Sequence, residues 1–136
     1  MFNTILLLIN AIIGLGFAFF YLAVSFLHLS LIQWPFYDPY YSWAFGGIFL
    51  ILSMFLLLTI KQDNWEKCKT VFEITIAWYI MILILNILSL IFIPAPTDSL
   101  IATWVYNVIF IILIVVNIYG TIVEISTDVK NTYKKF

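Results

Sequence analysis

This chain contains few charged residues and no arginine. Of its 136 residues, 10% are charged and 65% are hydrophobic, and the mean hydropathy is +1.13. A soluble globular domain carries about 25% charged residues, so this chain cannot surround a core with a wetted surface. We therefore expect lipid to be the solvent of most of its surface. The net charge of −1 argues against nucleic acid as a partner.

Residues that build catalytic and metal centres are also scarce, because the chain has one cysteine and one histidine. Cys68 cannot form an intrachain disulfide, and we expect it to be a free thiol in a loop, in a reducing compartment. A single histidine excludes bis-histidine haem ligation within one chain and the Glu-x-x-His pairs of di-iron bundles. No zinc-ligand spacing occurs. We therefore predict no catalytic residues, no cofactor and no metal site, which makes an enzyme the less favoured class.

Long apolar runs are what the chain does have. None contains an interior lysine, and each is long enough, or nearly so, to cross a hydrocarbon layer of about 30 Å as a helix. Barrel strands would instead alternate apolar and polar residues. The sequence predicts an all-α fold, a single domain over 1–136 that forms a four-transmembrane-helix bundle, with helices at about 4–31, 43–60, 71–93 and 100–125.

Proline and polar residues separate these runs. Pro35 and Pro39 end the first run, and a second pair of prolines, Pro94 and Pro96, separates the third from the fourth. Proline lacks the amide hydrogen and blocks the preceding helical turn, so it belongs at helix ends. The polar segment 61–70 separates the second run from the third.

The lysines predict the orientation in the membrane. Three lie between the second and third runs and three in the C-terminal tail: Lys61, Lys67, Lys69, Lys130, Lys134 and Lys135. With four crossings, these segments share one side, and the other two connections carry no basic residue. The positive-inside rule then predicts a multi-pass protein of the cell (plasma) membrane with cytoplasmic N- and C-termini.

The connection QWPFYDPYYSW, residues 33–43, is predicted to lie on the outer face. Six of its residues are aromatic, among them Trp34 and Tyr37. Tryptophan and tyrosine favour the headgroup zone, where an apolar ring and a polar tip are both satisfied. The segment is therefore an interfacial turn, a lid over a cavity, or a contact with a larger protein.

Polar and small residues recur at helical spacing within the runs, so each helix has a polar or small face. Interhelical hydrogen bonds and close packing at small residues hold membrane helices together. Asn10, Asn86, Asn107 and Asn117 are the best candidates for such bonds, and Gly14 and Ala18 form a small-xxx-small pair. Tyr21 lies on the same stripe as Asn10. These faces build either a bundle interior or a polar cavity for a small amphiphile.

Two ionisable residues near helix ends are candidate contacts. His28 is expected near the outer end of the first helix, and Glu124 near the inner end of the fourth, with Asp128 four residues later. Ionisable residues in membrane helices are functional candidates by default. Glu73 is expected in the first turn of the third helix, with Lys69 as its i−4 partner. His28 and Glu124 lie about 25–30 Å apart across the membrane, so they cannot share one catalytic site.

Short motifs add a resemblance over about residues 34–120: Trp34-Pro35, AFGG at 44–47, Asn64-Trp65 and ATWVY at 102–106. The chain resembles a widespread set of small prokaryotic four-helix integral membrane proteins of unknown function. That set tends to carry a histidine at the end of the third helix, where this chain has leucine, serine and leucine at 88–90. The resemblance implies the topology only.

Two functions follow as expectations. The first is a non-catalytic accessory subunit of a larger membrane complex, with membrane lipids and other membrane-protein subunits as partners. The alternative is a stand-alone binder of a lipid, quinone or other hydrophobic small molecule within the bundle. Contacts to the partner or ligand are expected from Tyr21, His28, Trp34, Tyr37, Asn86, Asn117 and Glu124.

Overall fold

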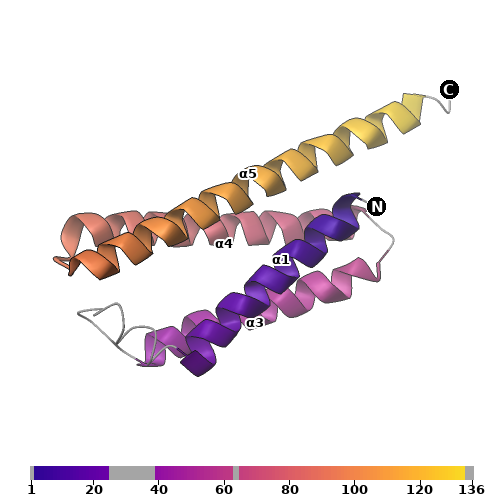
Figure 1. Cartoon of the computed structure of the whole chain (residues 1–136). Coiled ribbons are helices and arrows are strands. Elements are labelled where there is room, and N and C mark those ends of the chain that lie inside the picture. The colour runs from indigo at the N-terminus through magenta and orange to yellow at the C-terminus, as the bar shows by residue number, and fades with distance from the viewer. Residues whose placement is uncertain (1, 25–38, 63–64, 134–136) are drawn as a thin grey trace.

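The computed structural model describes residues 2–24, 39–62 and 65–133, and these ranges are almost entirely helical (Figure 1). The elements are α1 (Phe2–Phe19), the π-helical segment η1 (Phe20–Val24), α3 (Pro39–Ile60), α4 (Trp65–Phe92) and α5 (Thr97–Tyr133). Four stretches are long and apolar enough to cross a membrane: Thr4–Val24, Tyr40–Ile60, Cys68–Phe92 and Thr97–Val123. For the described residues, the predicted all-helical fold with four candidate spans is confirmed.

The helix ends differ from the predicted ones for a physical reason. α3 begins at Pro39 rather than at residue 43, because proline in the first turn sacrifices no intrahelical hydrogen bond. α4 begins at Trp65, inside the segment predicted as a loop, and α5 continues to Tyr133. Hydropathy marks where a span leaves the hydrocarbon, whereas the helical hydrogen bonds continue beyond that point. Residues 25–31 of the first predicted helix lie outside the described residues.

The helices are arranged as two antiparallel pairs. α1 lies along α3 and α4 lies along α5, and most contacts between helices fall within these pairs (Figure 1). We call the end where α1 begins and α3 ends the N-terminal end. The opposite end, where α3 begins and residues 93–96 join α4 to α5, is the Pro94 end. α5 finishes on the same side as the start of α1 and projects beyond the other helices.

The core near the N-terminal end is aliphatic, apart from Phe72 and the thiol of Cys68. It consists of Leu6, Leu7, Ala11, Leu56, Cys68 and Phe72. Cys68, predicted in a loop, is a buried residue in the first turns of α4, and its Sγ lies 3.8 Å from the carbonyl oxygen of Gln62. Its burial follows from the early start of α4, which turns this residue towards α1 and α3.

A second core, towards the Pro94 end, is largely aromatic. The ring of Phe17 stacks between Phe49 at 5.0 Å and Phe110 at 5.2 Å, measured between ring centroids. Tyr21 stacks on Phe49 at 6.1 Å, and Tyr79 packs on Phe110 at 5.7 Å. Rings from all four spans therefore meet here, and offset stacking of this kind adds about 0.5–1.5 kcal/mol per pair beyond area burial.

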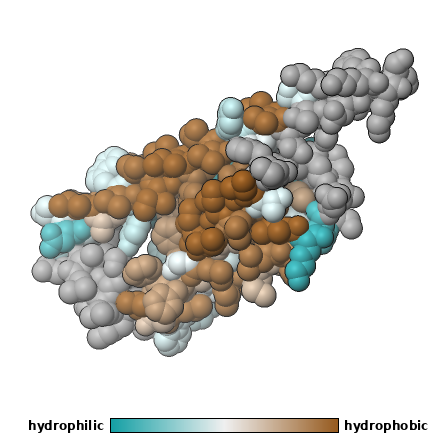
Figure 2. Space-filling view, turned by 45° about the vertical axis from the view of Figure 1, so that its right-hand side comes forward, coloured by the Kyte–Doolittle hydropathy of each residue, from teal (hydrophilic) through white to brown (hydrophobic). Residues whose placement is uncertain are grey.

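The outer surface of the spans is apolar, as a lipid-facing surface requires. Leucine, isoleucine, valine and phenylalanine side chains are exposed along the spans. Hydrophobic residues dominate the face drawn in Figure 2. The buried residues of α4 recur at steps of four and three, namely Cys68, Phe72, Thr75, Tyr79 and Ile82. The polar faces predicted for the helices therefore turn inward, and the apolar faces turn outward.

We expect Gly46→Ala to destabilise the contact between α3 and η1. A Cβ atom at Gly46 would lie 2.7 Å from Leu22 Cγ and 3.0 Å from Tyr21 Cβ, whereas at Gly47 it would meet nothing within 4 Å. Overpacking of this size costs about 1–3 kcal/mol. Unfolding in mixed micelles should show this loss for Gly46→Ala and none for the matched control Gly47→Ala. Equal stability of the two variants would contradict the close approach.

Candidate functional site

Three polar side chains from three helices form a hydrogen-bonded cluster inside the bundle. Asn10 on α1 and Asn117 on α5 exchange reciprocal amide bonds. Asn10 Nδ2 donates to Asn117 Oδ1 at 2.8 Å, and Asn117 Nδ2 donates to Asn10 Oδ1 at 2.9 Å. The hydroxyl of Tyr79 on α4 donates to Asn10 Oδ1 at 3.1 Å. We call these three residues the Asn10–Tyr79–Asn117 cluster.

The remaining amide hydrogens of this cluster are also used. Asn10 Nδ2 donates to the carbonyl oxygen of Leu6 at 2.8 Å, and Asn117 Nδ2 donates to that of Leu113 at 2.7 Å. Both asparagines are fully buried. Both N–H groups of each amide therefore donate to protein oxygens. The cluster ties α1, α4 and α5 together, which confirms Asn10 and Asn117 as interhelical hydrogen-bonding residues.

The hydroxyl side chains of the spans mostly bond within their own helix. They donate to carbonyl oxygens three or four residues earlier, at 2.7–3.0 Å: Ser53, Thr59, Thr75, Ser89, Thr103 and Thr121. This pattern satisfies a hydroxyl without a second helix. It explains why these residues can line helix contacts in a region without water.

Two buried polar groups are not paired with any of the described residues. Both Nδ2 and Oδ1 of Asn107 lack a hydrogen-bond partner there, and so does the indole Nε1 of Trp78. Asn107 is only 1% exposed. A buried amide left unpaired costs about 1–3 kcal/mol. The predicted interhelical bond is therefore confirmed for Asn10 and Asn117, while no described residue provides one for Asn107.

The other predicted contact residues are distributed over both ends of the bundle. Tyr21 is half-buried in η1 within the aromatic core. Asn86 is half-buried on α4, towards the Pro94 end. Glu124 follows the last residue of the α5 span, Val123, and its side chain is not among those described. His28, Trp34 and Tyr37 lie outside the described residues.

Glu73 forms the expected pair with Lys69, with 3.9 Å between Lys69 Nζ and Glu73 Oε1. Because α4 begins at Trp65, Glu73 lies in a later turn than predicted. Both side chains are substantially exposed. An exposed i, i+4 pair stabilises a helix by only about 0.3–0.5 kcal/mol, so this pair is a surface feature of the N-terminal end.

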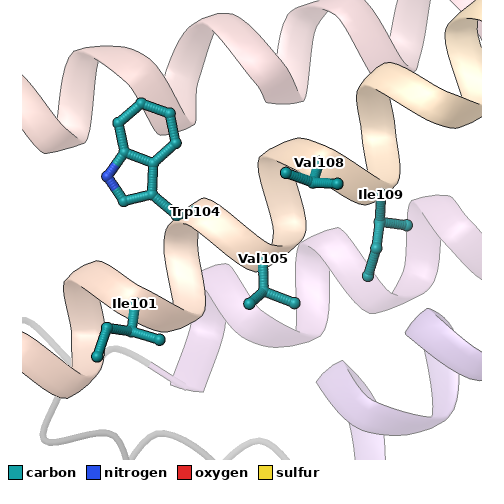
Figure 3. Close-up of a pocket in the computed structure, with 5 residues that line it drawn as sticks. All are labelled: Ile101, Trp104, Val105, Val108 and Ile109. Carbon is teal, nitrogen blue, oxygen red and sulfur yellow. The ribbon is translucent and has the colours of Figure 1, made fainter.

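An apolar hollow of about 390 Å³ lies along α5 near the Pro94 end. Figure 3 shows its lining residues, Ile101, Trp104, Val105, Val108 and Ile109, which all come from α5. None of the predicted contact residues is among them. With no polar lining surface, the hollow can hold a hydrocarbon chain but cannot orient a polar group.

The described residues offer little for catalysis or metal binding. Among them, no three histidine, cysteine or acidic side chains gather into a possible metal site. The four candidate spans also carry only one acidic and one basic residue between them, apart from Asp98 in the first turn of α5: Glu73 and Lys69. Neutral amides, hydroxyls and aromatic rings remain, and these groups bind and position other groups.

Comparisons with known proteins add no assignment: no protein-family model, curated protein or solved structure matches this chain.

Proposed function

We propose that this protein is a non-catalytic accessory subunit of a larger membrane complex. The observation that carries the proposal is a group of exposed aromatic rings at the start of α3. Tyr40, Tyr41 and Trp43 are 72%, 64% and 55% exposed. Tyrosine and tryptophan are enriched at protein interfaces and among the residues that dominate binding energy. These three rings are the aromatic side chains of segment 33–43 that the structure describes.

The rings are arranged as a local surface at the edge of the membrane. Tyr40 and Tyr41 contact each other edge to face, with their ring centroids 5.9 Å apart. The candidate span of α3 begins at Tyr40, so the rings lie where the hydrocarbon layer ends. An aromatic belt in the lipid headgroups is the competing role for this surface.

The proposed orientation places both termini in the cytoplasm and the Pro94 end outside the cell membrane. Lys61 and Lys69 lie at the N-terminal end of the bundle, where α5 also finishes. The positive-inside rule favours this side as cytoplasmic. The aromatic surface would then meet a partner subunit at the outer face.

Native mass spectrometry of the full chain, extracted gently from its own membranes, tests the proposal. We expect partner subunits at constant stoichiometry with the wild type. Replacing Tyr40, Tyr41 and Trp43 together with leucine should reduce the bound fraction about tenfold, as loss of interface anchors does. The matched control is Phe55→Leu on the same helix, because Phe55 is also 55% exposed.

A stable small homo-oligomer without partners would refute the accessory role. Unchanged partner binding by the triple variant would show that the rings serve only as an interfacial belt. Retention of partners by Phe55→Leu together with their loss from the triple variant would support the proposed contact.

A further inference from the structure

Asn107 differs from the other buried asparagines of the bundle in having no partner among the described residues. Asn10 and Asn117 share its residue type and its burial, yet they pair with each other. Asn107 keeps two donors on Nδ2 and an acceptor on Oδ1 without a bond. A group that satisfies this amide must therefore both donate and accept.

Helix geometry puts Asn86 and Asn107 about one helical turn apart in level along the contact between α4 and α5. The packing of Tyr79 on Phe110 puts these two residues at about the same level of the antiparallel helices. Asn86 lies seven residues after Tyr79 on α4. In an antiparallel pair it is therefore level with Thr103, which lies seven residues before Phe110 and four residues before Asn107 on α5. Four residues correspond to about 6 Å along a helix. Asn86 is partly exposed, so it offers a polar group between the level of Asn107 and the Pro94 end.

The described stretches of α4 and α5 around these two amides are neutral. No described residue from 74 to 97 or from 99 to 123 is charged. The hydroxyl of Thr103, the residue level with Asn86, donates to the carbonyl oxygen of Ser99 at 2.8 Å. A charged head group would therefore find no counter-ion among the described residues of these two stretches, and its desolvation would oppose binding.

We propose that the α4–α5 contact near the Pro94 end binds the hydroxyl head of a neutral membrane amphiphile through Asn107 and Asn86. A hydroxyl donates to Oδ1 of Asn107 and accepts from Nδ2, so one oxygen pairs with Oδ1 and with one of the two N–H groups. A ketone or quinone oxygen only accepts, and it would leave Oδ1 unpaired. The apolar tail lies against Leu83 and Leu90, half-buried residues about one turn from Asn86 on the same face of α4. This site is separate from the aromatic surface at the start of α3.

Photolabelling of the purified full chain tests this site. The probe is a fatty alcohol with a diazirine in its chain, and the control probe is its methyl ether, which cannot donate. We expect the alcohol to label peptides that contain residues 83–107 and the ether to label them far less. Asn107→Leu should reduce alcohol labelling about tenfold, the loss expected when two hydrogen bonds to a buried group are removed.

A control variant and a stability measurement accompany this test. Val108→Leu, a neighbouring exposed position, should keep the labelling. Asn107→Leu should also show no loss of thermal stability, because leucine replaces an amide that no described residue pairs. Equal labelling by alcohol and ether, or unchanged labelling of Asn107→Leu, would overturn the site. A large loss of stability in Asn107→Leu would show that Asn107 is paired within the protein and would overturn it as well.

Discussion

Asn117→Leu is expected to weaken the bundle strongly. It removes two of the hydrogen bonds of the buried amide of Asn10 and leaves one of its N–H groups without an acceptor. A buried unpaired donor costs about 1–3 kcal/mol, whereas hydrogen bonds between membrane helices average about 0.6 kcal/mol. We therefore expect a loss of about 2 kcal/mol, most of it from the unpaired N–H group of Asn10.

A double-mutant cycle separates the two contributions. Asn10→Leu and Asn117→Leu should each destabilise the protein, while the double variant should lose less than the sum, because it leaves no unpaired amide at either position. The free energy of unfolding, measured in mixed micelles, gives the coupling. Additive losses would mean that the reciprocal pair does not form. Asn107→Leu is the control, since its amide has no described partner that would be left unpaired.

Gly14→Ala is expected to have the second large effect, because α1 and α3 meet closely at this residue. A Cβ atom at Gly14 would collide with Ser53 Oγ, which donates to the carbonyl oxygen of Phe49 at 2.7 Å. The serine must rotate and give up this bond, or the helices must separate. Overpacking and a lost bond together predict a cost of about 1–3 kcal/mol.

The structure also predicts a second substitution that should restore the stability lost in Gly14→Ala. In a Ser53→Ala background, the nearest remaining atoms are the Cβ of residue 53 at 3.6 Å and the Phe49 carbonyl oxygen at 3.7 Å, both ordinary contacts. Gly14→Ala should then cost little. Gly16→Ala, where a Cβ meets nothing within 4 Å, is the matched control. The same cost of Gly14→Ala in both backgrounds would rule out the Ser53 collision as its cause.

Several features of the fold follow from the sequence through simple physics. Long apolar runs are stable only in contact with lipid, and the backbone groups of a chain in lipid must form their hydrogen bonds internally, as a helix does. Prolines mark the helix ends. The helical spacing of the polar residues predicted which faces turn inward, and Gly14 and Asn10 lie on such a face. Helix ends were less predictable, because α5 continues to Tyr133 in a polar segment that hydropathy cannot assign.

In the candidate site, too, the sequence predicted some features and not others. The sequence indicated four asparagines as hydrogen-bonding candidates but not their partners. Asn10 and Asn117 are 107 positions apart, and their pairing depends on the order and register of the helices in space. Trp78 carried no signal as a polar group, since an indole in an apolar run is typical of a core residue.

By itself, the sequence determined the class of protein, the number of candidate spans and the inward-facing stripes, because these depend on local composition and on the helical period. The tertiary structure alone decided that Asn117 is paired, that Asn107 is not paired with any described residue, and that Gly14 touches Ser53. Those outcomes depend on ångström-scale distances between helices. Such distances are set by the packing of whole helix faces and not by any single segment of the chain.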